Sequence, residues 1–393
     1  MKILQFVSSY APHWQAGGPP RVFYSYARNL IDLGYQVAVF TAYDAESPES
    51  GLAKLVDGIA VSYYRRFARS YLRRFYCNYS ASDITAWLNA NIDSFDLVHF
   101  GQVRMLPNIL MYRKLRETRK PYVVSAFGML PRRKEGLKTI YDAFFVKPLI
   151  RDADALLAQT DHEAEEYLRY GASQSKIHLL PLPVAEIPGD EDLDKGAFRL
   201  ANGIPSNSFH VIFLGRFHQA KGIGSLIDAF SEVLRSFPDT KLTLIGSDNG
   251  YLSEMESKVR ALDLAGSVKI LGPIYDRGRF SAYGDSDLYV IIPEVFEETS
   301  LASLEALSCG CPVLTTEKSE VPWLEEYGAG KIIKSGDLSA VVSGISQFIE
   351  DHKANGDRIR TNARLLVRER FLESSVARDL GSIFEAVKSA RCS

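Results

Sequence analysis

The sequence lacks the features that would place it in a membrane or in the secretory route. No apolar run within its 393 residues approaches the length of about 20 residues that a membrane-spanning helix needs. The opening residues, MKILQFVSSY, lack the basic and then apolar order of a secretion signal. We therefore expect a cytoplasmic protein.

Cysteine is also scarce, with four residues in the whole chain (Cys77, Cys309, Cys311 and Cys392). Their spacing matches neither a disulfide framework nor a set of metal ligands, and no histidine lies near Cys309 and Cys311. This pair is predicted to supply small residues where a helix turns back into a strand. The chain does contain Asp-x-Asp triplets of the kind that metal-dependent transferases use. Because two of them precede apolar strands and the third lies in a linker, we expect no metal and no cofactor (Asp152–Asp154, Asp285–Asp287 and Asp192–Asp194).

A net charge of −2 conceals an uneven distribution of charge. The first 147 residues hold 20 basic and 11 acidic residues, a balance of +9, which leaves −11 for the remainder. A basic N-terminal half indicates an anionic partner. No nucleic-acid-reading motif accompanies the charge, so we expect no nucleic acid. Membrane phosphate or a lipid-diphosphate sugar carrier fits better.

The length favours two domains, and apolar strands alternate with helical stretches throughout, which is typical of α/β proteins with parallel, doubly wound sheets. Residues 179–194, rich in proline and charge, are predicted to link the domains. Residues 367–387 have amphipathic helical spacing. The expected strands are Lys2–Val7, Gln36–Thr41, Leu97–Phe100, Tyr122–Ala126 and Ala155–Gln159 in the first sheet, and Val211–Leu214, Lys241–Ile245, Val268–Leu271, Leu288–Ile292, Val313–Thr315 and Lys331–Ile333 in the second.

Two glutamates stand eight residues apart in the segment PEVFEETSLASLEALSCGCPVL, residues 293–314. Glu297 follows an apolar strand, and Glu305 lies on the helix that the spacing of three leucines predicts over residues 300–308. Ligands of open α/β sheets bind at this carboxyl edge. Two carboxylates there can accept hydrogen bonds from a polyol such as a ribose or a hexose.

A second segment, VIFLGRFHQAKG (residues 211–222), is an apolar strand, a glycine turn and two cations, followed by a predicted helix over residues 224–233. A helix N-terminus beside Arg216 and Lys221 makes an anion site, because arginine binds phosphate through a fork of donors and lysine acts as a point charge. Together with the two glutamates, these cations favour a donor site for a nucleotide sugar.

The pattern G-R-x4-K-G followed by E-x7-E-A-L-x-x-G-x-P-V resembles that of the retaining glycosyltransferase family 4, of the type that builds bacterial surface polysaccharides. The resemblance covers nearly the whole chain. Residues 1–42 resemble the opening strand, Gly-Gly loop and first helix of that family, and residues 96–99 (DLVH) resemble its central motif. The resemblance implies a GT-B fold, in which two doubly wound, Rossmann-like domains face a central cleft. Residues 1–185 with a C-terminal helix at about 375–393 would bind the acceptor, and residues 186–374 would bind the nucleotide sugar.

The same resemblance assigns roles to individual residues. Arg216 and Lys221 would neutralise the leaving diphosphate, and Glu297 would hold hydroxyls of the transferred sugar. Glu305 would bind the ribose. His99 would act at a strand end on the acceptor side. The remaining donor-binding residues would be Gly17 and Gly18, which wall the diphosphate site, and Ser300 and Leu301 at the start of a helix.

Two features depart from or add to this pattern. The family histidine of a T-x-H-G turn is replaced by Phe127 in Ser125-Ala126-Phe127-Gly128, and phenylalanine cannot donate a hydrogen bond to a sugar. Residues 61–79 (VSYYRRFARSYLRRFYCNY) interleave five arginines with seven aromatic residues. Phe67, Tyr71 and Phe75 recur every four residues, so a helix here would carry an aromatic face flanked by cations. That face either docks on an anionic membrane surface, at the inner side of the membrane, or packs on its own domain.

The sequence therefore predicts a metal-independent, retaining glycosyltransferase. It would move a hexose-type sugar from a nucleotide-sugar donor to a glycan or a lipid-diphosphate-linked acceptor in polysaccharide biosynthesis. Two alternatives remain open at this point. One is a GT-B sugar epimerase, and the other is a non-catalytic GT-B subunit that binds a nucleotide sugar or acts as a scaffold, an alternative that Phe127 keeps open.

Overall fold

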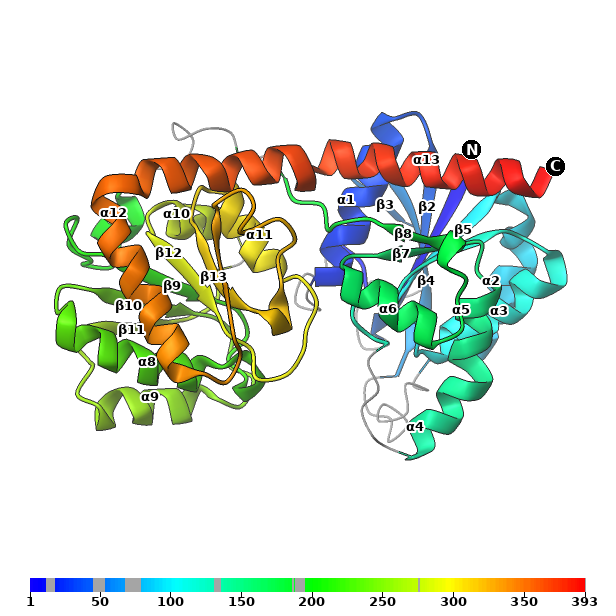
Figure 1. The fold of residues 1–393 in the computed structure, drawn as a ribbon. Helices are drawn as coiled ribbons and strands as arrows, with labels where there is room; N and C mark the ends of the chain where they lie inside the picture. The colour runs from blue at the N-terminus through cyan, green and yellow to red at the C-terminus, as the bar shows by residue number, and fades with distance from the viewer. Residues whose placement is uncertain are drawn as a thin grey trace. The chain divides into compact units, whose positions relative to one another are not determined.

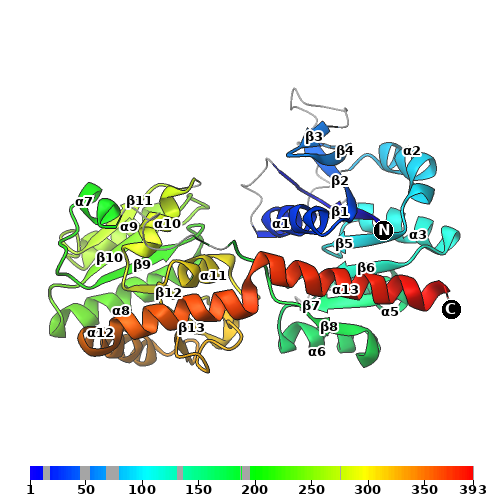
Figure 2. The same ribbon diagram turned by 90° about the horizontal axis from the view of Figure 1, so that it is seen from above.

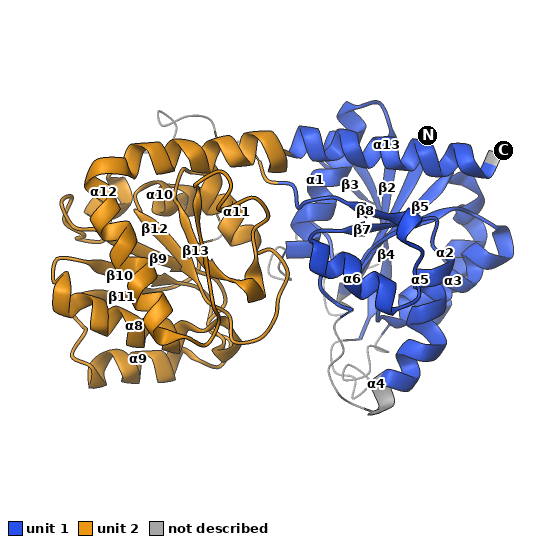
Figure 3. Ribbon diagram, in the orientation of Figure 1, with its two compact units in different colours: residues 1–183, 373–393 blue, residues 184–372 orange. Residues whose placement is uncertain are grey.

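The structure, a computed structural model, describes residues 1–11, 18–44, 54–67, 79–130, 136–185, 187, 195–274 and 276–392. The chain folds into two compact units, residues 1–183 with 373–393 (unit 1) and residues 184–372 (unit 2) (Figure 3). The binding roles that the sequence assigns to the two halves of the chain stay predictions.

Unit 1 is built on one sheet whose described strands follow the order β3-β4-β2-β1-β5-β6-β7-β8. All neighbouring strands are parallel except β3, which pairs with β4 in the antiparallel sense. The strands are β1 (Lys2–Val7), β2 (Gln36–Asp44), β3 (Lys54–Val56), β4 (Ile59–Arg66), β5 (Leu97–Gly101), β6 (Tyr122–Ser125), β7 (Ala155–Ala158) and β8 (Ile177–Leu179).

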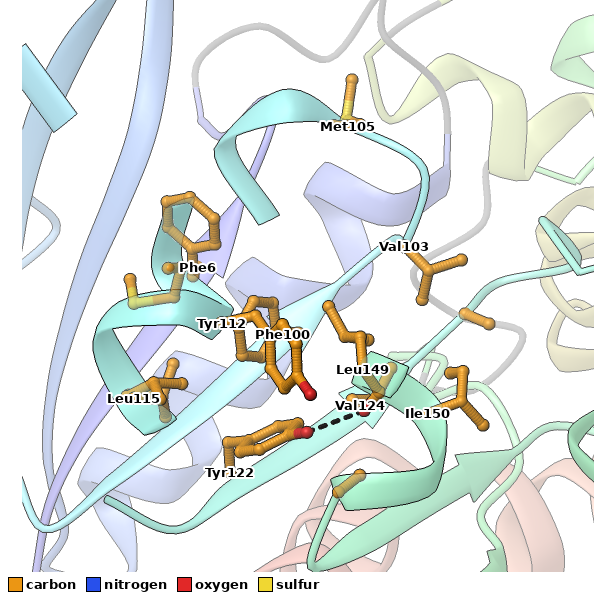
Figure 4. Packing of buried hydrophobic residues seen from close by; sticks show 14 of the residues in the cluster. Phe6, Phe100, Val103, Met105, Tyr112, Leu115, Tyr122, Val124, Leu149 and Ile150 are labelled. Carbon is orange, nitrogen blue, oxygen red and sulfur yellow. Dashed lines mark hydrogen bonds between the residues drawn. The ribbon is translucent and has the colours of Figure 1, made fainter. Parts of the chain in front are cut away.

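Helices cover this sheet on both faces (Figures 1 and 2). The strand period of two sends Val98 and Phe100 of β5 into a large core with residues of α2, α3, α5 and α6. Figure 4 shows part of this core, where the Tyr122 hydroxyl donates to the Leu149 carbonyl at 2.8 Å. The helices are α1 (Gly18–Asp32), α2 (Ala81–Asn91), η3 (Ile92–Ser94), α3 (Leu106–Thr118), α4 (Gly136–Tyr141), the π-helical turn η4 (Asp142–Val146), α5 (Lys147–Asp152), α6 (Asp161–Arg169), η5 (Gln174–Lys176) and α13 (Glu373–Cys392).

Unit 2 is a wholly parallel sheet in the order β11-β10-β9-β12-β13-β14. The order reverses between β9 and β12, which makes their carboxyl ends a topological switch point. Its strands are β9 (His210–Leu214), β10 (Lys241–Ile245), β11 (Val268–Leu271), β12 (Leu288–Ile291), β13 (Val313–Thr316) and β14 (Gly330–Ile333). Its helices are α7 (Ala197–Ala201), η7 (Gln219–Lys221), α8 (Ile223–Ser236), α9 (Leu252–Ala261), α10 (Gly278–Gly284), α11 (Leu301–Ser308), η8 (Glu317–Ser319), α12 (Leu338–Leu366) and the π-helical turn η9 (Val367–Phe371).

All eleven strands expected from the sequence are present, most of them with ends shifted by a residue or more. The sequence did not predict β3, β4 or β8. The prediction of a helix at residues 61–79 is wrong over Val61–Arg66, which belong to β4. There Ile59 and Val61 are buried and Ala60 between them is exposed, the period of two that a strand imposes. Tyr71 and Phe75 lie outside the described residues.

The amphipathic stretch at residues 367–387 is not one helix. Residues 367–371 continue α12 as a π turn, Leu372 is extended, and α13 begins at Glu373. Within unit 1, Phe384 of α13 packs against His99, and Arg391 binds Asp154 at 2.7 Å. No helix of the described residues has both the length and the apolarity to cross a bilayer.

Candidate active site

Two glycines bring the loop after β9 against the neighbouring strand ends. A Cβ atom on Gly222, whose φ is +71°, would lie 1.9 Å from the carbonyl oxygen of Ile292, just past the end of β12. A Cβ on Gly246 would lie 1.8 Å from the Gly215 carbonyl oxygen. No residue larger than glycine fits such contacts without movement of the backbone. The close approach at Gly222 places the end of η7 beside the segment that follows β12.

Lys221 and Glu297 form an ion pair at this switch point. The Lys221 ammonium donates to both carboxylate oxygens of Glu297, at 2.8 and 2.5 Å. The side chains keep 18% and 26% of their exposure, so the pair is partly shielded from water but open to a ligand. Backbone hydrogen bonds hold the segments that carry both partners. The Glu294 N–H donates to the carbonyl of Ala220, which precedes Lys221, and the Glu297 N–H donates to the Lys318 carbonyl. Two residues that the sequence assigned to one site are therefore in contact.

Glu305 pairs with Arg279, which the sequence analysis did not identify. From α10, the Arg279 guanidinium reaches both oxygens of Glu305 on α11, with three N···O distances of 3.2 Å. The side chains are 14% and 15% exposed. Arg279 also donates to the Asp276 carbonyl, and its guanidinium lies 4.1 Å from the Phe280 ring centroid. One carboxylate oxygen can still accept from a ligand hydroxyl while the arginine holds the group in place.

Two buried tyrosines lie within electrostatic reach of these carboxylates. Tyr283 and Tyr289 are fully buried, and their ring centroids lie 5.7 Å apart in an edge-to-face arrangement. Burial raises the pKa of both phenols, and the nearby charges of Glu305 and Glu297 raise it further. Both rings therefore stay neutral and apolar. Such a surface lowers the local dielectric constant and strengthens the neighbouring ion pairs.

The N-termini of two helices reach the same edge of the sheet. The N-cap of α8 is Gly222 and that of α11 is Ser300, and neither makes a side-chain capping hydrogen bond. Neither helix carries an acidic residue in its first turn. The first backbone N–H groups of a helix and its dipole attract anions. Ser300 and Leu301 lie at the start of α11, and their role in donor binding stays a prediction.

Arg216, the first cation after β9, is exposed. Its guanidinium has no partner among the residues that the structure describes. The adjacent backbone is ordered by the Phe217 N–H, which donates to the Ser247 carbonyl at 2.8 Å. Arg216 is thus available to bind an anion, whereas Lys221 is already bonded to Glu297.

The carboxylates of the two Asp-x-Asp triplets that the structure describes, Asp152–Asp154 and Asp285–Asp287, accept hydrogen bonds from other residues of the protein. The Asp285 carboxylate accepts from the N–H groups of Gly196 and Phe198, at 2.6 and 2.8 Å. Asp287 accepts from Arg199 at 2.6 Å and from the His210 N–H at 2.8 Å. Across the described ranges of the chain, no group of three or more acidic, histidine or cysteine side chains is arranged to hold a metal ion.

His99 is the third residue of β5, a strand that is one residue longer than expected, and its side chain is 0% exposed. Its ring packs against Phe23 at 4.7 Å and Phe384 at 5.4 Å between centroids, and its Nε2 is 2.9 Å from the Ser125 hydroxyl. His99 thus lies two residues before the end of β5 at Gly101, and its predicted catalytic role stays a prediction. The surroundings of His99 in this structure are those of a core residue.

Burial of His99 predicts a loss of stability in acid. Desolvation lowers its pKa to about 3, and burial likewise lowers that of His210 to about 4. At a pH below the ordinary histidine pKa of about 6.5, these histidines bind protons in the unfolded chain but stay neutral in the native fold. The free energy of unfolding therefore falls as the pH decreases. Replacing His99 with Gln should reduce this slope by about 1.4 kcal/mol per pH unit between about pH 6 and pH 4. Urea unfolding of the wild type and the variant at about pH 6 and pH 4 measures this slope.

The matched control for that experiment is the exposed His218, whose replacement with Gln should leave the slope as in the wild type. An unchanged slope in the His99→Gln variant would contradict the burial of a neutral imidazole.

The remaining predicted residues lie in unit 1. Gly18 is the first residue of α1, and Gly17 lies outside the described residues. Phe127 adopts a φ of +52° and packs edge-to-face on Phe23, 5.7 Å away between centroids. Beside it, the N–H of Gly128 donates to the buried carboxylate of Glu163, which also accepts from Gln159. This carboxylate joins the turns after β6 and β7, so the backbone of the turn is held whether or not its side chain is a histidine.

Comparison with known proteins covers nearly all of the chain. The family model "Glycosyl transferase 4-like domain" matches residues 17–183, and the model "Glycosyl transferases group 1" matches residues 194–365. The D-inositol 3-phosphate glycosyltransferase 2 of Catenulispora acidiphila is 24% identical over 84% of this chain and 82% of its own length. The phosphatidyl-myo-inositol mannosyltransferase of Mycolicibacterium smegmatis is 25% identical over 56% of each chain.

Among solved structures, that of Anabaena HepE in complex with UDP is similar to this chain. The TM-score is 0.76 at 18% identity, and the match covers 98% of this chain and 100% of HepE. This similarity confirms the expected GT-B fold with its two Rossmann-like sheets. The two family models, which together match most of the chain, show that the chain belongs to the group 1 (family 4) glycosyltransferases.

Proposed function

We propose that this glycosyltransferase moves a hexose-type sugar from a nucleoside diphosphate to a hydroxyl of a glycan or lipid-linked acceptor, with retention and without a metal ion. The observation that carries the proposal is the Lys221–Glu297 pair at the switch point of unit 2, beside two uncapped helix N-termini. Such a site offers cations and N–H groups to a diphosphate and carboxylates to sugar hydroxyls.

The proposed roles follow from the geometry of each group. The diphosphate binds Arg216, Lys221 and the first turns of α8 and α11. Glu297, released from Lys221 by the phosphate, accepts hydrogen bonds from the transferred sugar. Glu305 accepts from the ribose hydroxyls while Arg279 holds its carboxylate. Gly17 and Gly18 stay predicted donor-binding residues of the N-terminal part of the chain.

In the proposed reaction the bond between the anomeric carbon and the diphosphate oxygen breaks as the acceptor oxygen bonds to the same face of that carbon. The acceptor proton passes to the leaving phosphate, so the protein needs no separate general base. The two cations stabilise the charge that develops on the diphosphate. Preorganised groups of this kind typically contribute about 10²–10³ in rate.

The comparisons suggest testing UDP-glucose and nucleotide-linked mannose as donors first. HepE has been crystallised with UDP-glucose, and one relative is named a mannosyltransferase. A thermal-shift screen of UDP-, GDP-, ADP- and dTDP-sugars should yield one base that raises the melting temperature. Slow release of the free sugar, measured by mass, should accompany it. Binding of a donor without any turnover would instead favour the non-catalytic alternative, for which Phe127 is the relevant feature.

A further inference from the structure

An exposed apolar surface lies at the junction of α4 and the π turn in unit 1. Phe144 is 71% exposed, Ile140 57% and Phe145 41%. We call these three side chains the α4 tip. Figure 1 shows α4 at the lower end of unit 1, beyond the strands of the sheet. Large apolar groups gathered in this way are typical of an interaction surface, whereas single exposed ones need no explanation.

The backbone that carries the α4 tip is firmly held. Asp142, at the start of the π turn, accepts from Arg104 at 2.9 and 2.7 Å and from the Tyr170 hydroxyl at 2.6 Å. Both side chains of this ion pair are largely buried, at 13% and 7% exposed. Val146 and Leu149 on the opposite side of the segment are in the core. These contacts hold the backbone of the π turn that carries Phe144, and π turns of this kind occur frequently at functional sites.

A cavity of about 270 Å³ opens on the same segment, although none of the three tip side chains lines it. Its lining includes Ala143, the neighbour of Phe144, and the cations Lys147, Arg151 and Arg169. Arg151 binds Asp152, and Arg169 binds Glu165 and Glu166. Lys147 has no partner within the described part of the chain. The hollow thus offers a free ammonium group and two guanidinium groups that can exchange partners with a phosphate.

We propose that the α4 tip and this basic hollow dock unit 1 on an anionic lipid surface. The aromatic rings enter the headgroup region, and a lipid phosphate binds in the hollow. Aromatic and aliphatic groups flanked by cations are suited to the interface of a bilayer. Three side chains offer too little area for a stable protein partner, which typically buries about 800 Å² on each side. The balance of +9 over the first 147 residues attracts the same surface.

This inference goes beyond the proposed reaction, because lipid binding needs no donor. The predicted membrane role of residues 61–79 stays a prediction, because residues 68–78 lie outside the described residues. For a lipid-linked acceptor, docking would bring the substrate to the enzyme.

Co-sedimentation of the full chain with vesicles tests the proposal. The wild type should bind vesicles of phosphatidylglycerol and phosphatidylcholine at least tenfold more tightly than vesicles of phosphatidylcholine alone, and high salt should remove the difference. Replacing both Phe144 and Phe145 with Ser should weaken binding to the anionic vesicles at least tenfold. Replacing Lys147 and Arg151 with Gln should markedly reduce the preference for anionic lipid. The matched control is Leu200→Ser in unit 2, because Leu200 is also a large apolar side chain and is 84% exposed. The Leu200→Ser variant should bind the anionic vesicles as tightly as the wild type does.

Two results would overturn the proposal. One is wild-type binding that neither the lipid charge nor the tip variants change. The other is a dimer in solution that the Phe144/Phe145 variant dissociates, without vesicle binding by the wild type, which would assign the tip to a second copy of the chain. Melting temperature and UDP binding, measured without vesicles, establish that each variant is folded. They also separate failure of the docking proposal from failure of the proposed function.

Discussion

Replacing Lys221 with Ala should slow sugar transfer by about 10²–10³ while the protein stays folded. The ammonium group is a partly buried cation of the site, and the proposed chemistry needs it where charge develops on the leaving diphosphate. Because the side chain lies at the edge of the sheet rather than in the core, its removal should lower the melting temperature only slightly. Single-turnover transfer at saturating donor measures the rate of the chemical step.

The matched variant is Lys221→Arg, which keeps the positive charge and should retain much of the rate. Transfer by Lys221→Ala at close to the wild-type rate would exclude electrostatic stabilisation by this residue. A large loss in Lys221→Ala together with a normal melting temperature is the expected pattern.

Replacing Glu297 with Gln should change binding and catalysis in opposite directions. In the structure both carboxylate oxygens of Glu297 accept from Lys221, so a diphosphate must compete with this carboxylate for the ammonium group. The neutral amide competes less well, and we expect UDP to bind about tenfold more tightly, equivalent to about 1.4 kcal/mol. Transfer should nevertheless slow by about a hundredfold, because the amide is a weaker acceptor for the sugar hydroxyls. Calorimetry and steady-state kinetics measure the two effects.

Glu294→Gln serves as the control, since Glu294 lies three residues earlier on the same loop and engages Ala220 through its backbone N–H. It should leave both quantities near their wild-type values. Weaker UDP binding by Glu297→Gln would mean that the carboxylate does not compete with the diphosphate.

The presence of Lys221 and Glu297 at one edge of the sheet could be predicted from sequence, although their ion pair could not, because each residue lies in a short motif at the end of an apolar strand. Parallel strands bring such ends to one edge of a sheet, so the two motifs had to meet. Arg279 could not be found in the same way. It is a single cation on a seven-residue helix, and only its contact with Glu305 distinguishes it from a surface arginine.

The errors also have physical causes. His99 stands near the end of an apolar run, and the sequence does not fix where the strand stops. The strand extends one residue further than expected, to Gly101, and all five of its residues are buried, so His99 lies in the core. Residues 61–66 contain aromatic and basic residues whose spacing is compatible with a helix or a strand. Parallel pairing with β2 makes this segment a strand. Tertiary pairing of this kind overrides local patterns.

The central claim is that Lys221 binds the donor diphosphate and that Glu297 holds Lys221 until the diphosphate arrives. Its most direct test is the calorimetric affinity for UDP of four proteins: the wild type, Lys221→Ala, Glu297→Gln and the double variant. We predict that Glu297→Gln tightens UDP binding about tenfold when Lys221 is present and has no effect on UDP binding when Lys221 is Ala. An equal gain from Glu297→Gln in both backgrounds would show that the carboxylate acts on UDP independently of Lys221, and it would contradict the account.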